Sequence, residues 1–181
     1  TSQVPATLAG VDVVFPVLHG PFGEDGTVQG LLELAGVAYV GPGVAASAVA
    51  MDKDLFKAVM RGNGIPVTQS IAVHSHERHR VENPYGYPVV VKPARLGSSV
   101  GISIVRSEPD FPAAIELAFE HDDKLLVEQY VSGREVECSV LGSEEPAASL
   151  VGEIVPLKAD WYDFSSKYDE DGMELVVPAR I

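Results

Sequence analysis

Three short segments of this sequence carry the chemical groups that a nucleotide-binding site needs. The first is an apolar run that ends in Lys92, and the second is the glycine- and serine-rich turn at residues 97–101. The third is an apolar run that ends in Glu128. A lysine and the backbone N–H groups of such a turn can bind phosphate, and a carboxylate can accept from the amino group of adenine. ATP is therefore the leading candidate ligand, although the P-loop pattern GxxxxGK[ST] is absent from the sequence.

Each of these residues also has a simpler structural interpretation. A lysine at a strand end commonly just extends its ammonium into solvent, and Glu128 could be a solvated residue at a strand end. The turn favours phosphate binding, because glycines let the backbone approach a ligand and Ser98 and Ser99 add hydroxyl donors. In the nucleotide interpretation Glu128 and the backbone beside it contact adenine, and Glu135 reaches the ribose. The positions beside Glu128 are Gln129, Tyr130 and Val131.

The apolar patterns predict an alternation of strands and helices that would position these groups. The first forty residues indicate strand, helix and strand, the end of a doubly wound α/β unit. Asp52 is expected to cap a helix whose apolar face is Leu55, Phe56, Val59 and Met60, and Asp110 to cap a helix over 111–119. The expected strands are 11–17, 37–40, 67–73, 89–92, 100–104, 125–130, 135–141, 147–157 and 175–177, with an exposed connection at 74–84.

Glycine- and proline-rich punctuation divides the sequence into three parts. Gly41-Pro42-Gly43 and Ser132-Gly133 mark the two boundaries. The division is 1–41 for the end of an N-terminal α/β domain, 42–131 for a central subdomain, and 132–181 for the beginning of a strand-rich subdomain. The last of these has no helix to cover its sheet, so we expect it to be incomplete.

The composition narrows the class of function. The net charge of −13 without a basic patch argues against nucleic-acid binding. The sequence has neither a membrane-length apolar run nor a signal-peptide pattern, so we expect no membrane association. A single cysteine, Cys138, is consistent with a reducing cytoplasm, and its alternating apolar neighbours predict a buried, inert thiol.

Two further loops contain residues that could bind ligands. His19 follows a predicted strand in a glycine-rich loop, where α/β folds place ligand contacts, although a histidine that only bonds the backbone is the alternative. The aromatic loop at 161–168 could close as a lid, with Lys167 facing phosphate. Three histidines at 74, 76 and 79 do not match a zinc-site spacing and are interpreted as a solvated loop.

Four ordered motifs resemble those of the bacterial D-alanine–D-alanine ligases. Residues 19–33, HGPFGEDGTVQGLLE, are similar to the family's HGxxGEDGxxQGxLE stretch. AMDK at 50–53, VKP at 91–93 with GSSVG at 97–101, and FSSKY at 164–168 continue the resemblance in the same order. It covers nearly all of the chain from Val11 onward. The resemblance implies the ATP-grasp fold, in which two α+β subdomains hold ATP between them behind an N-terminal α/β domain.

The resemblance also implies a role for each matching residue. Lys53, Lys92 and Lys167 are similar to lysines that contact phosphate, and Glu128, Val131 and Glu135 to residues that contact adenine and ribose. His19 and Ser98 resemble groups near the D-alanine site, and Tyr168 resembles a lid tyrosine that bonds to that serine. The implied cofactors are ATP and Mg2+ or Mn2+, and the implied reaction joins two D-alanines through an acyl phosphate for peptidoglycan synthesis. The enzyme would be cytoplasmic, and a homodimer is an assembly that the resemblance allows.

Parts of the family pattern have no counterpart here. The family's N-terminal strand with its glutamate is not found before Val11, and its Arg-x-Asp and Glu-x-Asn strands are not found before Ile181. We therefore expect a partial ligase without its metal ligands, unable to turn over alone. Three alternatives stay open: a ligase that joins D-alanine to D-lactate, another ATP-grasp carboxylate–amine ligase, and a non-catalytic nucleotide-binding module. A Rossmann dehydrogenase is excluded because no GxGxxG follows the strand at 11–17.

Overall fold

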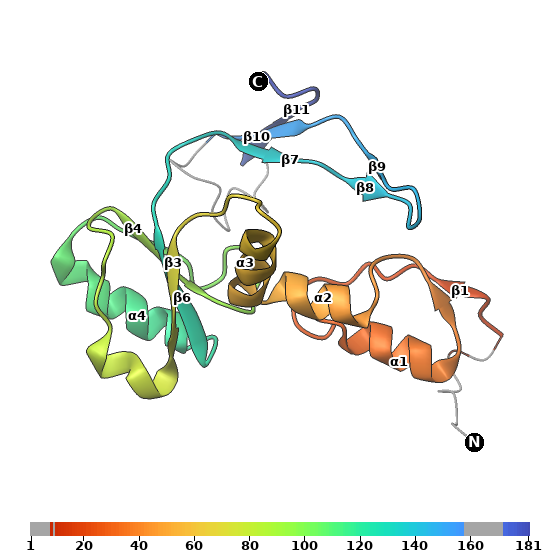
Figure 1. Cartoon of the computed structure of the whole chain (residues 1–181), viewed down its shortest axis with the longest axis horizontal. Helices are drawn as coiled ribbons and strands as arrows, with labels where there is room; N and C mark the ends of the chain where they lie inside the picture. Colours follow the sequence, from red (N-terminus) through yellow and green to blue (C-terminus); the bar gives the residue numbers. More distant parts are fainter. Residues whose placement is uncertain (1–7, 9, 158–171) are drawn as a thin grey trace. The chain divides into compact units, whose positions relative to one another are not determined.

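The computed structural model describes residue 8, residues 10–157 and residues 172–181, and it divides the chain into two compact units. The first unit contains residues 1–130 and the second contains residues 131–181. The described α-helices all belong to the first unit, and the described elements of the second unit are strands (Figure 1).

The first unit begins with the predicted strand, helix and strand. Strand β1 (Val13–Val14) pairs in parallel with β2 (Ala38–Tyr39), and helix α1 (Thr27–Ala35) connects them. β1 is shorter than the predicted strand at 11–17, because β2 offers partners to only two of its residues. Gly36 ends α1 with φ of 68°, a left-handed conformation that glycine adopts without steric cost.

Helices α2 (Val44–Met51) and α3 (Lys53–Gly62) follow, and Asp52 lies between them. The predicted cap is confirmed: the Asp52 carboxylate accepts from the backbone N–H groups of Asp54 and Leu55 at 3.1 and 3.2 Å. The predicted apolar face of α3 is partly exposed. Leu55, Phe56 and Val59 are 48, 40 and 43% exposed, whereas Lys57 is only 7% exposed. Helix α3 therefore turns a charged side chain, not its apolar stripe, toward the interior.

A four-stranded antiparallel sheet forms the body of the first unit. Its strands are β3 (Ser70–His74), β4 (Val89–Pro93), β5 (Ser103–Val105) and β6 (Lys124–Gln129), in the order β3-β6-β4-β5. Helix α4 (Phe111–Phe119) packs on one face and closes the hydrophobic core. The buried core residues are Val73, Val89, Val91, Val105, Phe111, Ala114, Ile115, Ala118, Leu125 and Val127.

The register places Lys92 and Glu128 on the face of the sheet opposite α4. Val90 is paired with Glu128, and Lys92 with Leu126. Because successive side chains of a strand alternate between faces, these positions lie on the side opposite Val91 and Val127, which are in the core. Lys124, also on β6, has the same parity as Glu128 and binds the Asp52 carboxylate with N–O distances of 2.9 and 2.6 Å. This pair attaches the beginning of α3 to the sheet.

Three local predictions for the first unit were wrong in detail. Residues 74–84 are not wholly irregular, because Ser75–Arg80 form the 3-10 helix η2. The strand at 100–104 begins only at Ser103, since consecutive turns occupy the residues before it. Asp110 does not cap α4 with its side chain. The 3-10 turn η3 (Glu108–Asp110) runs directly into α4, and the Asp110 carboxylate instead accepts from the Ser107 hydroxyl at 2.6 Å.

The second unit contains two small antiparallel sheets. Strand β10 (Gly152–Pro156) lies between β7 (Glu135–Glu137) and β11 (Met173–Val176), and β8 (Val140–Leu141) pairs with β9 (Ala147–Ala148). The long strands predicted at 135–141 and 147–157 are thus each divided. At the break, the Ser149 hydroxyl accepts from the N–H of Ser139 at 3.0 Å.

The prediction for the thiol in this unit was wrong. Cys138 is exposed, and its sulfur lies 3.4 Å from the Ser149 carbonyl oxygen. It directly follows β7, whose three residues are all exposed. Alternation of apolar residues therefore did not indicate burial here, because in this unit β7 is an edge strand of its sheet.

We expect the Asp52–Lys124 pair to be a major contributor to the stability of the first unit. Asp52→Asn keeps a good helix cap but removes the charge, which leaves the buried Lys124 ammonium without its counterion. The expected loss is about 3 kcal/mol in the free energy of unfolding, measured by denaturant titration.

Asp54→Asn is the matched control, because Asp54 lies in the same helical turn, 3.6 Å from Lys124, but is far more exposed. It should cost less than about 1 kcal/mol. Equal, small losses for the two variants would contradict the assignment.

Candidate functional site

The structure brings Lys92 and Glu128 into direct contact on neighbouring strands. Lys92 Nζ lies 2.6 Å from Glu128 Oε1, and the Glu128 side chain is 9% exposed. The solvated-glutamate interpretation is therefore wrong: Glu128 is buried and ion-paired. Because β4 and β6 are antiparallel neighbours, Lys92 and Glu128 lie diagonally across the pair on one face of the sheet, with Lys92 opposite Leu126 and Glu128 opposite Val90.

A second ammonium, from Lys57 on α3, contacts the other oxygen of the same carboxylate. Lys57 Nζ forms an ion pair with Glu128 Oε2, and it also donates to the carbonyl and hydroxyl oxygens of Thr68, each at 2.9 Å. Burial lowers the pKa of Lys57, while the hydrogen bond to Glu128 acts in the opposite direction. The sequence analysis missed Lys57. Its position one helical turn after Lys53, which places both on one side of α3, was the available signal.

Lys53 binds the segment that connects β4 to the glycine- and serine-rich turn. Its ammonium donates to the carbonyl oxygens of Pro93 and Ala94 at 3.2 and 3.4 Å, and to that of Leu96. Its backbone N–H donates to the Ala94 carbonyl at 3.0 Å. Burial, helped by the positive charge of Lys92, lowers the pKa of Lys53 to about 8. Lys53 and Lys92 are thus close enough to interact electrostatically.

The turn at 97–101 has an unusual backbone conformation. Ser98 and Ser99 have φ of 54° and 59°, in the left-handed region that non-glycine residues rarely adopt. Such conformations are costly and cluster at ligand-binding sites. Gly101 has φ of 69°, and a Cβ at this position would lie 2.9 Å from the Pro93 side chain. A glycine is therefore required there.

The loop that contains His19 lies beside this turn. The Glu24 carboxylate accepts from the N–H of Gly20 at 2.6 Å. The same carboxylate lies 4.0 Å from where a Cβ of Gly97 would be. His19 itself is exposed and immediately precedes Gly20. Glu24 was not among the predicted site residues, yet its carboxylate lies near Gly97 of the turn.

The remaining predicted residues lie at the end of β6, in the second unit or outside the described residues. Gln129 is exposed at the end of β6, and Tyr130 is half-buried. Val131 and Glu135 are exposed and belong to the second unit. Lys167 and Tyr168 lie outside the described residues. The structure therefore unites Lys53, Lys92 and Glu128, with the turn at 97–101 attached through the carbonyls that Lys53 binds.

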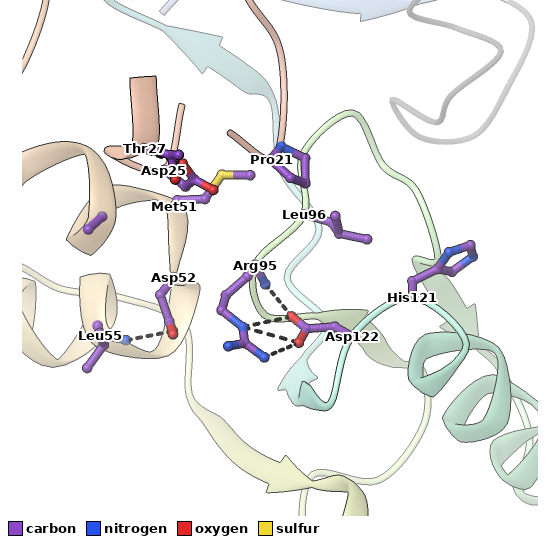
Figure 2. Close-up of a pocket in the computed structure, with 11 residues that line it drawn as sticks. Pro21, Asp25, Thr27, Met51, Asp52, Leu55, Arg95, Leu96, His121 and Asp122 are labelled. Carbon is purple, nitrogen blue, oxygen red and sulfur yellow. Dashed lines mark hydrogen bonds and ion pairs between the residues drawn. The ribbon is translucent and has the colours of Figure 1, made fainter. Parts of the chain in front are cut away.

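A separate cavity of about 400 Å3 lies at the beginning of α3, and none of the predicted site residues lines it (Figure 2). Arg95 and Asp122 face each other there, with Asp52 and Leu55 on the neighbouring helix. Burial raises the pKa of Asp122, but hydrogen bonds from Arg95 outweigh this, and the net shift is downward. These two side chains bind each other, and Asp25, Thr27 and His121 also line the cavity.

Comparison with known proteins identifies the family. Residues 59–181 match the family described as D-ala D-ala ligase C-terminus, and residues 1–42 match D-ala D-ala ligase N-terminus. The chain belongs to the D-alanine–D-alanine ligase family. Its fold is accordingly the mixed α/β fold of these ligases, with the end of the N-terminal domain and the ATP-grasp portion.

Individual members of the family are similar over nearly the whole chain. The chain is 48% identical to the D-alanine–D-alanine ligase of Bacillus velezensis, covering 98% of this chain and 52% of that protein. It is 49% identical to D-alanine–D-alanine ligase A of Escherichia coli, covering 94 and 48%. The chain therefore spans about half the length of the curated relatives it matches.

Solved structures of ligases share the fold. The VanG D-Ala:D-Ser ligase from Enterococcus faecalis superimposes with a TM-score of 0.83 at 43% identity, covering 94% of this chain and 51% of that one. The D-alanine–D-alanine ligase from Coxiella burnetii gives 0.71 at 44% identity, covering 78 and 44%. The arrangement of elements described above is thus that of the family.

Among the described residues, no group of three or more His, Cys, Asp or Glu side chains is placed to bind a metal ion. In the same part of the chain, no helix is both long and apolar enough to span a membrane.

We predict that the Lys53 ammonium loses its proton at a lower pH than exposed lysines do. With lysine Cε labelled for 13C NMR, one resonance should titrate near pH 8, because the ammonium is buried beside Lys92. Exposed lysines should titrate at about pH 10.4. Between these two values the unfolded chain holds more protons than the folded chain, so this group's contribution to the unfolding free energy rises with pH.

Lys53→Arg identifies the Lys53 signal, since this substitution should remove the resonance that titrates near pH 8. Arginine stays charged over this range, so it preserves the cation. If every lysine titrates above pH 10 in the folded protein, the described environment of Lys53 is wrong.

Proposed function

We propose that the protein carrying this sequence is an ATP-dependent ligase that joins two D-alanines for peptidoglycan synthesis. The observation that carries the proposal is the cluster of Lys53, Lys92 and Glu128 on one face of the sheet, in a chain whose relatives are D-alanine–D-alanine ligases. A cation pair beside a buried carboxylate suits a ligand with both phosphates and an amino group, as ATP has.

In this proposal the phosphates of ATP lie against Lys53 and Lys92, and adenine lies against Glu128. Lysine is a compact cation that binds phosphate as a point charge. Val131 and the backbone of Gln129 and Tyr130 contact the adenine edge, and Glu135 binds the ribose hydroxyls. The strained turn presents the N–H groups of Ser98 and Ser99 to the phosphates.

The reaction proceeds in two balanced steps. A carboxylate oxygen of the first D-alanine attacks the γ-phosphorus, so an acyl phosphate forms and ADP leaves. The amine of the second D-alanine then attacks the acyl carbonyl, the C–O bond to phosphate breaks, and the amine loses a proton. The lysines offset the negative charge of the transferring phosphoryl group, which is the main catalytic requirement of such transfers.

The D-alanine end of the site is assigned to His19, Ser98 and Tyr168. The contact between Glu24 and the Gly97 position supports this, because it places the His19 loop beside the serine turn. Tyr168 would bond to Ser98 when the lid closes, with Lys167 facing phosphate, and a closed lid would protect the acyl phosphate from water. The division at 1–41, 42–131 and 132–181 is retained as the proposed domain organisation.

We propose three further properties from membership of this family: the cofactors, the cellular location and the assembly. Such a ligase uses ATP together with Mg2+ or Mn2+, whose ligands we place outside the described residues. It works in the cytoplasm, where ATP is available, and a homodimer is the proposed assembly. No step above depends on a metal ligand from this chain.

A second candidate differs in the second substrate. The VanG D-Ala:D-Ser ligase shares the fold at a TM-score of 0.83 and 43% identity, so fold alone does not distinguish D-alanine from D-serine as the acceptor. The tyrosine in the FSSKY motif favours D-alanine.

The proposed activity is tested with the intact protein that carries this sequence. Phosphate release from ATP should require D-alanine, and dipeptide formation should be greatest with D-alanine as the acceptor, compared with D-serine, D-lactate and L-alanine. A higher rate with D-serine would favour the second candidate. ATP binding without phosphate release for any acceptor would instead indicate a nucleotide-binding module.

Lys92→Ala should weaken ATP binding roughly 10- to 100-fold, the range for losing a charged hydrogen bond. The fold should survive, because Glu128 keeps its contact with Lys57. Calorimetry gives the dissociation constant, and thermal unfolding checks the fold.

Arg80→Ala provides the control, since it removes an exposed cation from η2. It should leave ATP affinity unchanged. Equal ATP affinity in Lys92→Ala and the unsubstituted protein would contradict the assignment of Lys92 to phosphate.

A further inference from the structure

Lys57 is the member of the charged cluster that the proposed ATP contacts do not use. It lies on α3, whereas Lys92 and Glu128 are on the sheet, and all three meet at one carboxylate. The inference below rests on the proposed function, because it concerns how the same site recognises adenine.

The ammonium of Lys57 has three close partners. It carries three N–H donors, and its partners are Glu128 Oε2, the Thr68 carbonyl and the Thr68 hydroxyl. Its side chain is only 9% exposed. These contacts hold Lys57 to the sheet edge and make it a fixed counterion rather than a contact for substrate.

Lys92 is bound differently. Its ammonium donates to Glu128 Oε1, and among the described residues this contact occupies one of its three protons. Its side chain is 16% exposed, more than those of Lys57 and Glu128. Lys92 can therefore exchange its partner, whereas Lys57 cannot do so without breaking three contacts.

The two proposed roles of Lys92 and Glu128 compete for one oxygen. Glu128 Oε1 accepts from Lys92, so an adenine amino group that donates to the same oxygen shares it with this ammonium until Lys92 turns to phosphate. A buried carboxylate left without any cation is strongly destabilised. Lys57 avoids this destabilisation, because its ammonium stays beside Glu128 Oε2 when Lys92 turns to phosphate.

We propose that Lys57 is a positioning residue that keeps Glu128 charged and fixed while Lys92 transfers from Glu128 to the nucleotide phosphate. The exchange couples the two ends of the nucleotide: phosphate draws Lys92 away, and the freed Oε1 accepts from a 6-amino purine. A 6-oxo purine presents an oxygen to the same carboxylate and is repelled. The selectivity of the site for adenine thus depends on a helix residue that does not contact the nucleotide.

The test compares ATP with inosine triphosphate, which has an oxygen at position 6, by calorimetry on the intact protein. Lys57→Gln should weaken ATP binding roughly 10- to 100-fold and reduce the preference for ATP to within about threefold. Lys57→Arg should restore most of both, because it keeps the cation. Arg61→Gln, an exposed cation one turn further along α3, should behave like the unsubstituted protein.

The ratio of the two affinities is the decisive quantity. A merely structural role for Lys57 would weaken both nucleotides equally, so an unchanged ratio in Lys57→Gln overturns the inference. Absence of ATP binding by the unsubstituted protein would overturn the proposed function as well. ATP binding with normal preference for ATP in every variant overturns only the role of Lys57.

A second variant decides the question if Lys57→Gln does not fold, as judged by circular dichroism. Thr68→Val has nearly the same shape but lacks the hydroxyl that accepts from Lys57 at 2.9 Å. All charges stay in place, and the preference for ATP should fall several-fold through looser positioning of Lys57. An unchanged preference in this folded variant would likewise overturn the inference.

Discussion

Buried ion pairs, not apolar contacts, attach helix α3 to the sheet of the first unit. Asp52 binds Lys124 at the beginning of the helix, and Lys57 binds Glu128 one turn further on. Ionised groups in such surroundings require close partners, because the desolvation of each charge is costly. The position of α3 is therefore fixed by the geometry of two carboxylates and two ammonium groups. Once α3 is fixed, Lys53 is held against the segment that leads to the serine-rich turn.

This way of attaching a helix connects stability with ligand recognition. The core residues between α4 and this face of the sheet are apolar, so they offer no polar group to a ligand. The opposite face carries Lys92 and Glu128, and α3 supplies Lys57 as a second cation for the Glu128 carboxylate. An apolar helix face at this position would pack more simply, but it would leave Glu128 with Lys92 alone. The polar packing thus keeps a carboxylate available for a ligand without leaving it uncompensated.

Some of this arrangement could be predicted from the sequence, and the reason differs from residue to residue. The ends of the strands at Lys92 and Glu128 are visible because buried strands are apolar runs, and a polar residue ends each run. Asp52 is visible as a cap because capping is local. The burial of Lys57 could not be predicted, since periodicity locates the apolar stripe of a helix but does not show what the helix packs against. The burial of Cys138 was predicted wrongly for a related reason. Alternating apolar residues indicate a strand, but they do not show whether anything packs on it.

The charge of the cluster offers a further argument for an anionic ligand. Lys53, Lys57 and Lys92 gather near Glu128, in a protein whose net charge is −13. Burial and repulsion by Lys92 lower the pKa of Lys53, and the carboxylates of Asp122, Glu128 and Asp52 offset this effect only in part. A triphosphate would relieve that repulsion and raise the proton affinity of Lys53 on binding. Lys57 stabilises the carboxylate, Lys53 and Lys92 meet the anion, and each cation therefore has a different task within one electrostatic balance.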